Sequence, residues 1–99
     1  ARWFREYMIY DPAQDLATIV HPVLAITGAK DIQVDPDHVA TIGRTVTGSF
    51  DGEVPADLSH LLRRDPRPAS LRTYRKQLRQ PVDRWVIDRT TDWARLHLT

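Results

Sequence analysis

Hydrophobic positions near the start of the chain follow a helical period. Residues 3–10 carry apolar side chains at helical spacing, and Asp11-Pro12 ends that pattern because the residue before a proline disfavours the helical backbone. Pro12 then begins a second short helix, which Asp11 can cap. The apolar stripe of this second helix is Leu16, Ile19 and Val20. Both helices are short, which indicates that they cover a larger body.

Residues 22–27 form an uninterrupted apolar run that predicts a buried strand. The run is Pro-Val-Leu-Ala-Ile-Thr and ends at Gly28, a pattern typical of a parallel strand that is covered on both faces. After an acidic loop, residues 36–46 have the features of a helix, with Asp35 as a cap and Pro36 at the first position. Its inward stripe is Val39, Ile42 and Val46. Strand, loop and helix make half of a βαβ unit.

The second half of the chain contains one weak strand candidate and one long helix. The candidate strand is residues 53–56, where Pro55 restricts it to an edge or a bulge. The helix follows Pro81 for about four turns, and Asp83 near its start and His97 near its end suit the helix dipole. Two strands alone are marginal, so the pattern predicts a single α/β unit over residues 1–99 whose sheet is incomplete.

Composition places the chain among globular proteins. Its 99 residues are 41% hydrophobic and 27% charged, which excludes collagen-like, mucin-like and highly charged disordered chains. The absence of Cys excludes a disulfide framework, a thiolate nucleophile and a Cys-based metal site, and is compatible with the cytoplasmic location that we expect. Because no apolar run approaches the roughly 18 residues of a membrane span, we expect no membrane partner and no secretory leader.

Charge is distributed unevenly along the chain. Residues 1–59 hold four basic and nine acidic side chains, whereas residues 60–99 hold ten basic and four acidic ones. A basic half raises the alternative of nucleic-acid binding. The acidic residues interleaved with the arginines favour a solvated, salt-bridged face instead. They are Asp65, Asp83, Asp88 and Asp92.

Two polar residues follow the two strand candidates. Asp31 comes after the apolar run, and His60 lies in the loop after the second candidate, 29 residues later. Open α/β sheets place their functional loops at the carboxyl ends of the strands. A histidine base needs a carboxylate on its Nδ1–H to fix its tautomer and stabilise the imidazolium. The spacing therefore predicts that Asp31 and His60 meet as a pair.

The strings 28–34 (GAKDIQV) and 58–62 (LSHLL) carry a family resemblance over residues 3–98. Together with Asp11-Pro12, Pro81-Val82 and Asp92-Trp93, they resemble the C-terminal segment of the α/β-hydrolases, in the branch of serine aminopeptidase-like and acyl esterase-like serine hydrolases. The resemblance implies the last two strands of that fold with flanking helices. It further implies that Asp31 is the triad acid, that His60 is the general base, that the substrate is an ester, peptide or similar acyl compound, and that no cofactor or metal takes part. The acid precedes the base, as in that family.

The nucleophile of that family is missing from the chain. Its Gly-x-Ser-x-Gly turn has no counterpart around Ser49, Ser59 or Ser70. We therefore expect the serine and the oxyanion hole to lie upstream, in an N-terminal part, and the 99 residues alone to be inactive. We also expect self-association through an unpaired strand edge, or association with that N-terminal part. The alternative from another class is a non-catalytic interaction or oligomerisation module.

Structural roles account for the remaining polar and aromatic candidates. Asp35 and Asp37 are interpreted as carboxylates of a loop and a helix start, because the glycine and the bidentate glutamate of a calcium loop are absent. Three further histidines lack metal-ligand spacing. They are His21, His38 and His97. Trp85 and Trp93 are interpreted as core anchors of the last helix.

Overall fold

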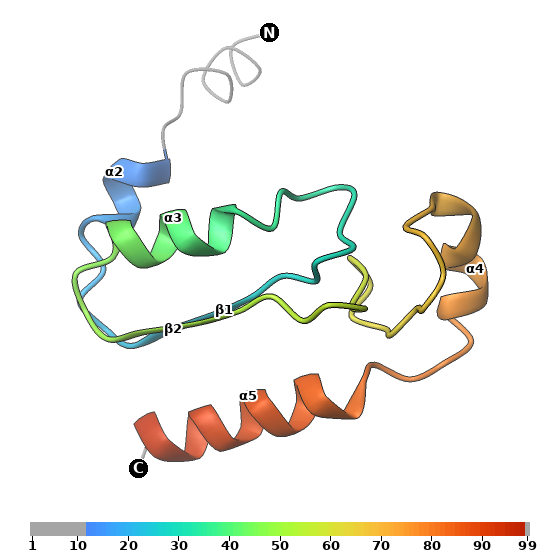
Figure 1. Cartoon of the computed structure of the whole chain (residues 1–99). Coiled ribbons are helices and arrows are strands. Elements are labelled where there is room, and N and C mark those ends of the chain that lie inside the picture. The colour runs from blue at the N-terminus through green and yellow to red at the C-terminus, as the bar shows by residue number, and fades with distance from the viewer. Residues whose placement is uncertain (1–11, 99) are drawn as a thin grey trace, which may run out of the picture.

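The chain, described here from a computed structural model, folds into a small mixed α/β structure (Figure 1). The structure describes residues 12–98, so the predicted helix at residues 3–10 and the cap at Asp11 lie outside the described residues. In chain order the elements are α2 (Pro12–Leu16), β1 (Val23–Ile26), α3 (His38–Thr45), β2 (Phe50–Glu53), the 3₁₀ helix η1 (Leu71–Thr73), α4 (Tyr74–Gln77) and α5 (Arg84–His97).

Strands β1 and β2 pair in parallel and are connected through α3. The register runs from Val23 opposite Phe50 to Ile26 opposite Glu53. The predicted strand at residues 22–27 and its parallel pairing are therefore confirmed. The predicted helix after it is present, but it begins at His38 with Asp37 at the N-cap position, so the placing of Asp35 as its cap and Pro36 as its first residue is wrong. The predicted burial of this strand on both faces is wrong, because all four residues of β1 are half-buried.

The second strand lies earlier in the chain than its pattern predicts. It covers Phe50–Glu53 instead of residues 53–56. Pro55 has no N–H to donate to a sheet, and it lies beyond the strand, where its carbonyl accepts a hydrogen bond from the Ala29 N–H at 2.9 Å. The ring of Phe50 fills the space left by two glycines, Gly43 on α3 and Gly52 on β2 itself.

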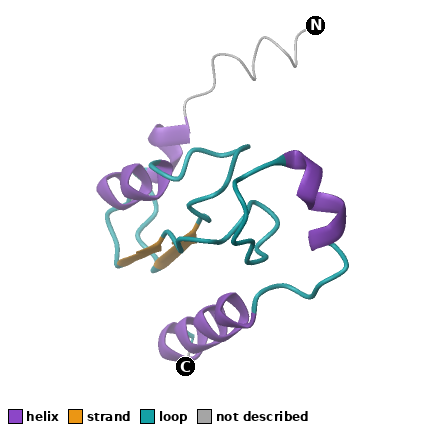
Figure 2. Ribbon diagram, turned by 45° about the vertical axis from the view of Figure 1, so that its right-hand side comes forward, coloured by secondary structure: helices purple, strands orange, loops and turns teal. Residues whose placement is uncertain are grey.

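Helices cover both faces of the two strands, so the structure has three layers (Figures 1 and 2). Helix α3 lies on one face, where the buried Val39 contacts the backbone at Gly52. Helix α5 lies on the other face, where the Arg89 guanidinium is 3.2 Å from the Glu53 carboxylate. This helix begins where predicted, because the Asp83 side chain accepts a hydrogen bond from the Trp85 N–H at 3.1 Å and caps it.

Few apolar side chains are fully covered within residues 12–98. The buried hydrophobic residues are Val39, Val46, Leu58 and Val86. The radius of gyration of 15.7 Å exceeds the value of about 13 Å expected for a compact domain of 100 residues. A cleft of about 290 Å³ separates the sheet from α5. It is lined by Leu24, Ile26, Leu62, Val86, Thr90 and Trp93.

One edge of β1 is open. The N–H groups of Val23 and Thr27 donate to Ser49 and Glu53 on the β2 side. Because backbone groups alternate along a parallel strand, those of Leu24 and Ile26 point to the opposite edge. Within residues 12–98, the sheet contains no third strand to occupy that edge.

Among the described residues, every helix is too short or too polar to cross a membrane.

Candidate active site

The loops that leave β1 and β2 remain hydrogen-bonded beyond the ends of the strands. The N–H of Ala29 donates to the Pro55 carbonyl at 2.9 Å, and the N–H of Lys30 donates to the Leu58 carbonyl at 3.1 Å. The two loops therefore run side by side past the carboxyl ends of the strands. This arrangement brings Asp31 and His60 to the same place, although 29 residues separate them.

Gly28 allows the two loops to approach closely. It is buried, and a Cβ at this position would overlap the carbonyl oxygen of Leu58. Leu58 is itself fully buried, so it has little freedom to move away. A residue without a side chain is required at position 28 because of this close approach.

The Asp31 carboxylate is held by the backbone of its own loop. Its Oδ1 accepts hydrogen bonds from the N–H groups of Gln33 and Val34, each at 2.8 Å. These bonds form an Asx-type turn, which fixes the side chain and leaves Oδ2 directed at His60. Only 5% of the Asp31 side chain is exposed.

His60 lies at the tip of a tight hairpin. The N–H of Ser59 donates to the Arg63 carbonyl at 3.0 Å, and the N–H of Leu62 donates back to the Ser59 carbonyl at 3.0 Å. Leu62 has a φ of 62°, in the left-handed region that a residue with a side chain seldom adopts. This turn is the commonest way to close a three-residue hairpin, and it presents His60 toward Asp31.

The two predicted site residues are in direct contact. Nδ1 of His60 lies 2.9 Å from Oδ2 of Asp31. Burial by itself would raise the pKa of the Asp31 carboxyl, but hydrogen bonds from Val34, His60 and Gln33 outweigh it and hold the pKa below its ordinary value. An ionised carboxylate only accepts, so Nδ1 carries the proton and Nε2 is the nitrogen left to act as a base.

Lys30 ties the Asp31 loop to the segment after the hairpin. Its ammonium group donates to the carbonyl oxygens of Asp65 and Arg67 at 2.6 and 2.8 Å, and lies 3.2 Å from the Asp57 carboxylate. Three contacts from one side chain thereby fix the position of one loop against the other. Lys30 was not predictable as a site residue, because a lysine next to the acid has no sequence signature of its own.

A buried polar cluster behind His60 was likewise not predicted from the sequence. Ser59, Asp65 and Gln77 are each 3–4% exposed, and Gln77 hydrogen-bonds to both of the others. Asp65 was expected on a solvated face but is buried here. The Tyr74 hydroxyl, one turn before Gln77, is buried and has no hydrogen-bond partner among residues 12–98.

None of the three serines contacts His60 through a side-chain hydrogen bond within the described part of the chain. The Ser59 hydroxyl donates to Gln77, and the Ser70 hydroxyl caps η1 by accepting from the Arg72 N–H. Ser49 is exposed just before β2, and its carbonyl accepts a hydrogen bond from the Val23 N–H. The pair of acid and base is therefore present without a nucleophile beside it.

The other candidates have structural roles in the described region. Asp35 accepts a hydrogen bond from the Asp37 N–H at 2.9 Å in the turn that begins α3. The Trp93 ring lies 4.9 Å from the His97 ring at a tilt of 39°, and Nε2 of His97 lies 3.9 Å from the Asp51 carboxylate. Within residues 12–98, no three side chains of the metal-ligating types converge on one point.

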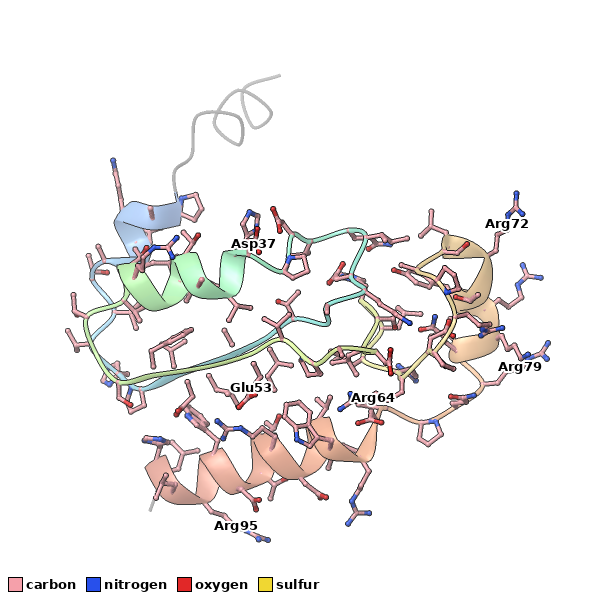
Figure 3. All side chains as sticks on the ribbon, viewed as in Figure 1. Asp37, Glu53, Arg64, Arg72, Arg79 and Arg95 are labelled. Carbon is pink, nitrogen blue, oxygen red and sulfur yellow. The ribbon has the colours of Figure 1, made fainter. Side chains whose placement is uncertain are left out.

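The basic side chains of the second half differ in whether they have an acidic partner. Arg64 and Arg84 pair with acidic neighbours, as expected for a salt-bridged face, whereas Arg67 pairs with the buried Asp65. Four cations on η1, on α4 and in the turn after α4 do not, and none of them has an acidic partner among the described residues. This basic stripe consists of Arg72, Arg75, Lys76 and Arg79, and Figure 3 shows its first and last members pointing away from the body.

Comparisons with protein-family models, with curated proteins and with solved structures find no match to this chain.

Proposed function

We propose that the chain is the C-terminal part of a serine hydrolase of the α/β-hydrolase type. In this proposal Asp31 is the acid and His60 the general base for the hydrolysis of an ester, a peptide or a similar acyl compound. The observation that carries the proposal is the 2.9 Å contact between His60 Nδ1 and Asp31 Oδ2 at the carboxyl ends of two parallel strands. The nucleophilic serine is supplied by polypeptide outside these residues.

The reaction assigns one task to each nitrogen of His60. Nε2 takes the proton of the serine hydroxyl as its oxygen attacks the acyl carbonyl, and the resulting imidazolium returns that proton to the leaving group. Water then attacks the acyl-enzyme, and Nε2 of His60 again acts as the general base. Throughout, Nδ1 remains hydrogen-bonded to Asp31, whose lowered pKa keeps it ionised and able to stabilise the imidazolium. No cofactor or metal has a role in these steps.

The open edge of β1 supports the proposal that a further segment of polypeptide completes the sheet. The backbone groups of Leu24 and Ile26 face that edge, and an additional parallel strand would satisfy them. Its side chains would also cover the exposed part of the apolar cleft between β1 and α5. In this proposal the segment that completes the sheet also brings the serine to Nε2 of His60.

The test compares acid and base variants in the protein together with the polypeptide encoded upstream of these residues. Asp31→Asn and His60→Ala should each lower kcat/KM for a p-nitrophenyl ester by about a thousandfold to ten-thousandfold. Matched controls are Asp37→Asn and His38→Ala, which alter exposed residues of the same types near the start of α3. An unchanged kcat/KM in either site variant would overturn the assignment. Residues 1–99 alone should show no turnover.

A non-catalytic interaction module is the second candidate. The open edge of β1 and the exposed aliphatic side chains near the end of α5 favour it, since Leu96 and Leu98 are 75% and 77% exposed. This function predicts a concentration-dependent dimer in light scattering that Asp31→Asn leaves intact. A monodisperse monomer at high concentration would contradict it.

A further inference from the structure

Gln77, the last residue of α4, is buried against the hairpin that carries His60. Its side-chain carbonyl accepts a hydrogen bond from the hydroxyl of Ser59, at 2.5 Å. Its side-chain nitrogen donates to Asp65 Oδ2 at 3.1 Å and to the Thr73 hydroxyl at 2.9 Å. Only 3% of Gln77 is exposed, so these bonds are not exchanged for water. One side chain thus joins the hairpin to the helix beside it.

Asp65 determines which way the Gln77 amide faces. Hydrogen bonds from Arg67, led by that of its guanidinium, hold the pKa of the Asp65 carboxyl far below its usual range despite the opposing effect of burial. The ionised carboxylate can only accept, so the amide nitrogen of Gln77 must face it, and the amide oxygen must face Ser59. The Ser59 hydroxyl consequently donates to Gln77 and keeps its lone pairs for another donor.

That other donor lies on the far side of His60. The Ser59 oxygen accepts a hydrogen bond from the Leu61 N–H at 3.2 Å. One hydroxyl, oriented by Gln77, therefore fixes the backbone on both flanks of His60. The imidazole has a single hydrogen-bond partner among residues 12–98, Asp31, so its direction depends on the backbone that carries it.

The strained turn makes this support necessary. Leu62 adopts a φ of 62°, a backbone conformation that is unfavourable for a residue with a side chain. If the turn relaxes, Leu62 leaves this conformation. The hydrogen bond from the Asp83 N–H to the Leu62 carbonyl, at 2.9 Å, holds the far end of the turn, whereas Gln77 holds the near end through Ser59.

We propose that Gln77 is a positioning residue for His60, keeping its Nδ1 against Asp31 by fixing the turn at Ser59. The catalytic consequence rests on the proposed function, whereas the positioning itself is a property of the folded chain. In this assignment Gln77 contacts neither of the two reacting atoms, which are Nε2 of His60 and the hydroxyl oxygen of the nucleophilic serine. It acts through Ser59 and the backbone of residues 59–61.

The test measures the Nδ1 proton of His60 by NMR in the protein labelled with ¹⁵N-histidine. Gln77→Met keeps the length of the side chain and removes its hydrogen bonds, and we expect it to speed exchange of this proton with water at least about tenfold. The matched control is Gln80→Met, three residues later, where the side chain is exposed and has no hydrogen bond among the described residues. His60→Gln identifies the resonance. An exchange rate unchanged by Gln77→Met in a folded protein overturns the proposal.

A second variant covers the case in which Gln77→Met unfolds the protein, as judged by circular dichroism. Ser59→Ala removes only the hydroxyl that Gln77 orients, and we expect the same acceleration. An unchanged rate in folded Ser59→Ala likewise overturns the positioning role. A wild-type resonance that Asp31→Asn does not alter would instead contradict the Asp31–His60 pair, and with it the proposed function.

Activity adds a readout that a general loss of stability does not give. In the protein that contains the nucleophile, Gln77→Met should lower kcat by about ten- to a hundredfold and leave KM unchanged, because misplacing a catalytic base weakens the chemical step. A rise in KM with kcat unchanged would contradict the assignment to His60.

Discussion

Gly28 lies so close to Leu58 that a Cβ on residue 28 would overlap the carbonyl oxygen of Leu58. The same carbonyl accepts the N–H of Lys30, so it is already engaged in holding the two loops together. The distance between Asp31 and His60 is therefore set, in part, by the absence of a side chain three residues before the acid.

Gly28→Ala should separate the two loops. We expect a loss of about 2–4 kcal/mol in the free energy of unfolding, because the backbone on both sides must shift. Urea denaturation measures this loss. Gly48→Ala is the control, since a Cβ there overlaps the Val20 carbonyl near the opposite ends of the strands. Both variants should be less stable, but only Gly28→Ala should alter the NMR signal of His60. Wild-type stability in Gly28→Ala would contradict the close approach.

Lys30→Met should destabilise the same junction through lost hydrogen bonds. The variant leaves the carbonyls of Asp65 and Arg67 without their charged donor, which lies 2.6 and 2.8 Å away. We expect a loss of about 2–3 kcal/mol, typical of charge-assisted bonds to partly buried groups. Lys76→Met, on the basic stripe, should change the free energy of unfolding by less than about 0.5 kcal/mol. Equal effects of the two variants in urea denaturation would refute this prediction.

Acid should weaken the fold through Asp31 and Asp65. Both carboxyl groups have a pKa below the ordinary 3.8 in the folded chain, so the unfolded chain takes up protons first as the pH falls. The contribution of these two carboxyl groups to the free energy of unfolding is complete well above pH 3.8. It is lost as the pH falls toward their pKa values in the folded chain. We expect the free energy of unfolding to fall below about pH 4, and less steeply in Asp31→Asn and Asp65→Asn. Identical slopes of the free energy of unfolding against pH in the wild type and both variants would contradict this prediction.

Tyr74 should titrate above its ordinary pKa of 10.0. Burial of the hydroxyl raises the pKa first, and the negative charge of Asp31 raises it further. Ultraviolet absorbance of the phenolate during alkaline titration gives the value, with Tyr74→Phe identifying its share of the signal. Asp31→Asn should lower the pKa of Tyr74. A titration indifferent to that substitution would indicate that α4 does not lie beside the acid.

The fold was predictable where local pattern and tertiary structure agree. The apolar run of β1 and the cap at Asp83 mark elements that the structure contains. Strand β2 carries Asp51, Gly52 and Glu53, none of which favours a strand. Arg89 on α5 lies against both carboxylates, at 3.8 Å from Asp51 and 3.2 Å from Glu53. Because Arg89 is distant from these two carboxylates along the chain, a local sequence pattern does not show that it compensates their charge.

The meeting of Asp31 and His60 was predictable for a geometric reason. Carboxyl ends of neighbouring parallel strands lie at one edge of a sheet, so polar residues after both strands come together. Their catalytic role stays a prediction. Gln77 and Tyr74 had no such signal, because the direction in which α4 packs depends on the turn at Leu62 and on the path of the chain after it.

The basic stripe makes this part of the chain susceptible to proteolysis. Trypsin cleaves after arginine and lysine, and the four residues of the stripe lie exposed on two very short helical segments and in the turn that follows them. Nicking after Arg75 or Lys76 would sever the segment that contains Gln77 from the preceding turn. A protease with this preference would thus disconnect the support of His60 while sparing both members of the pair.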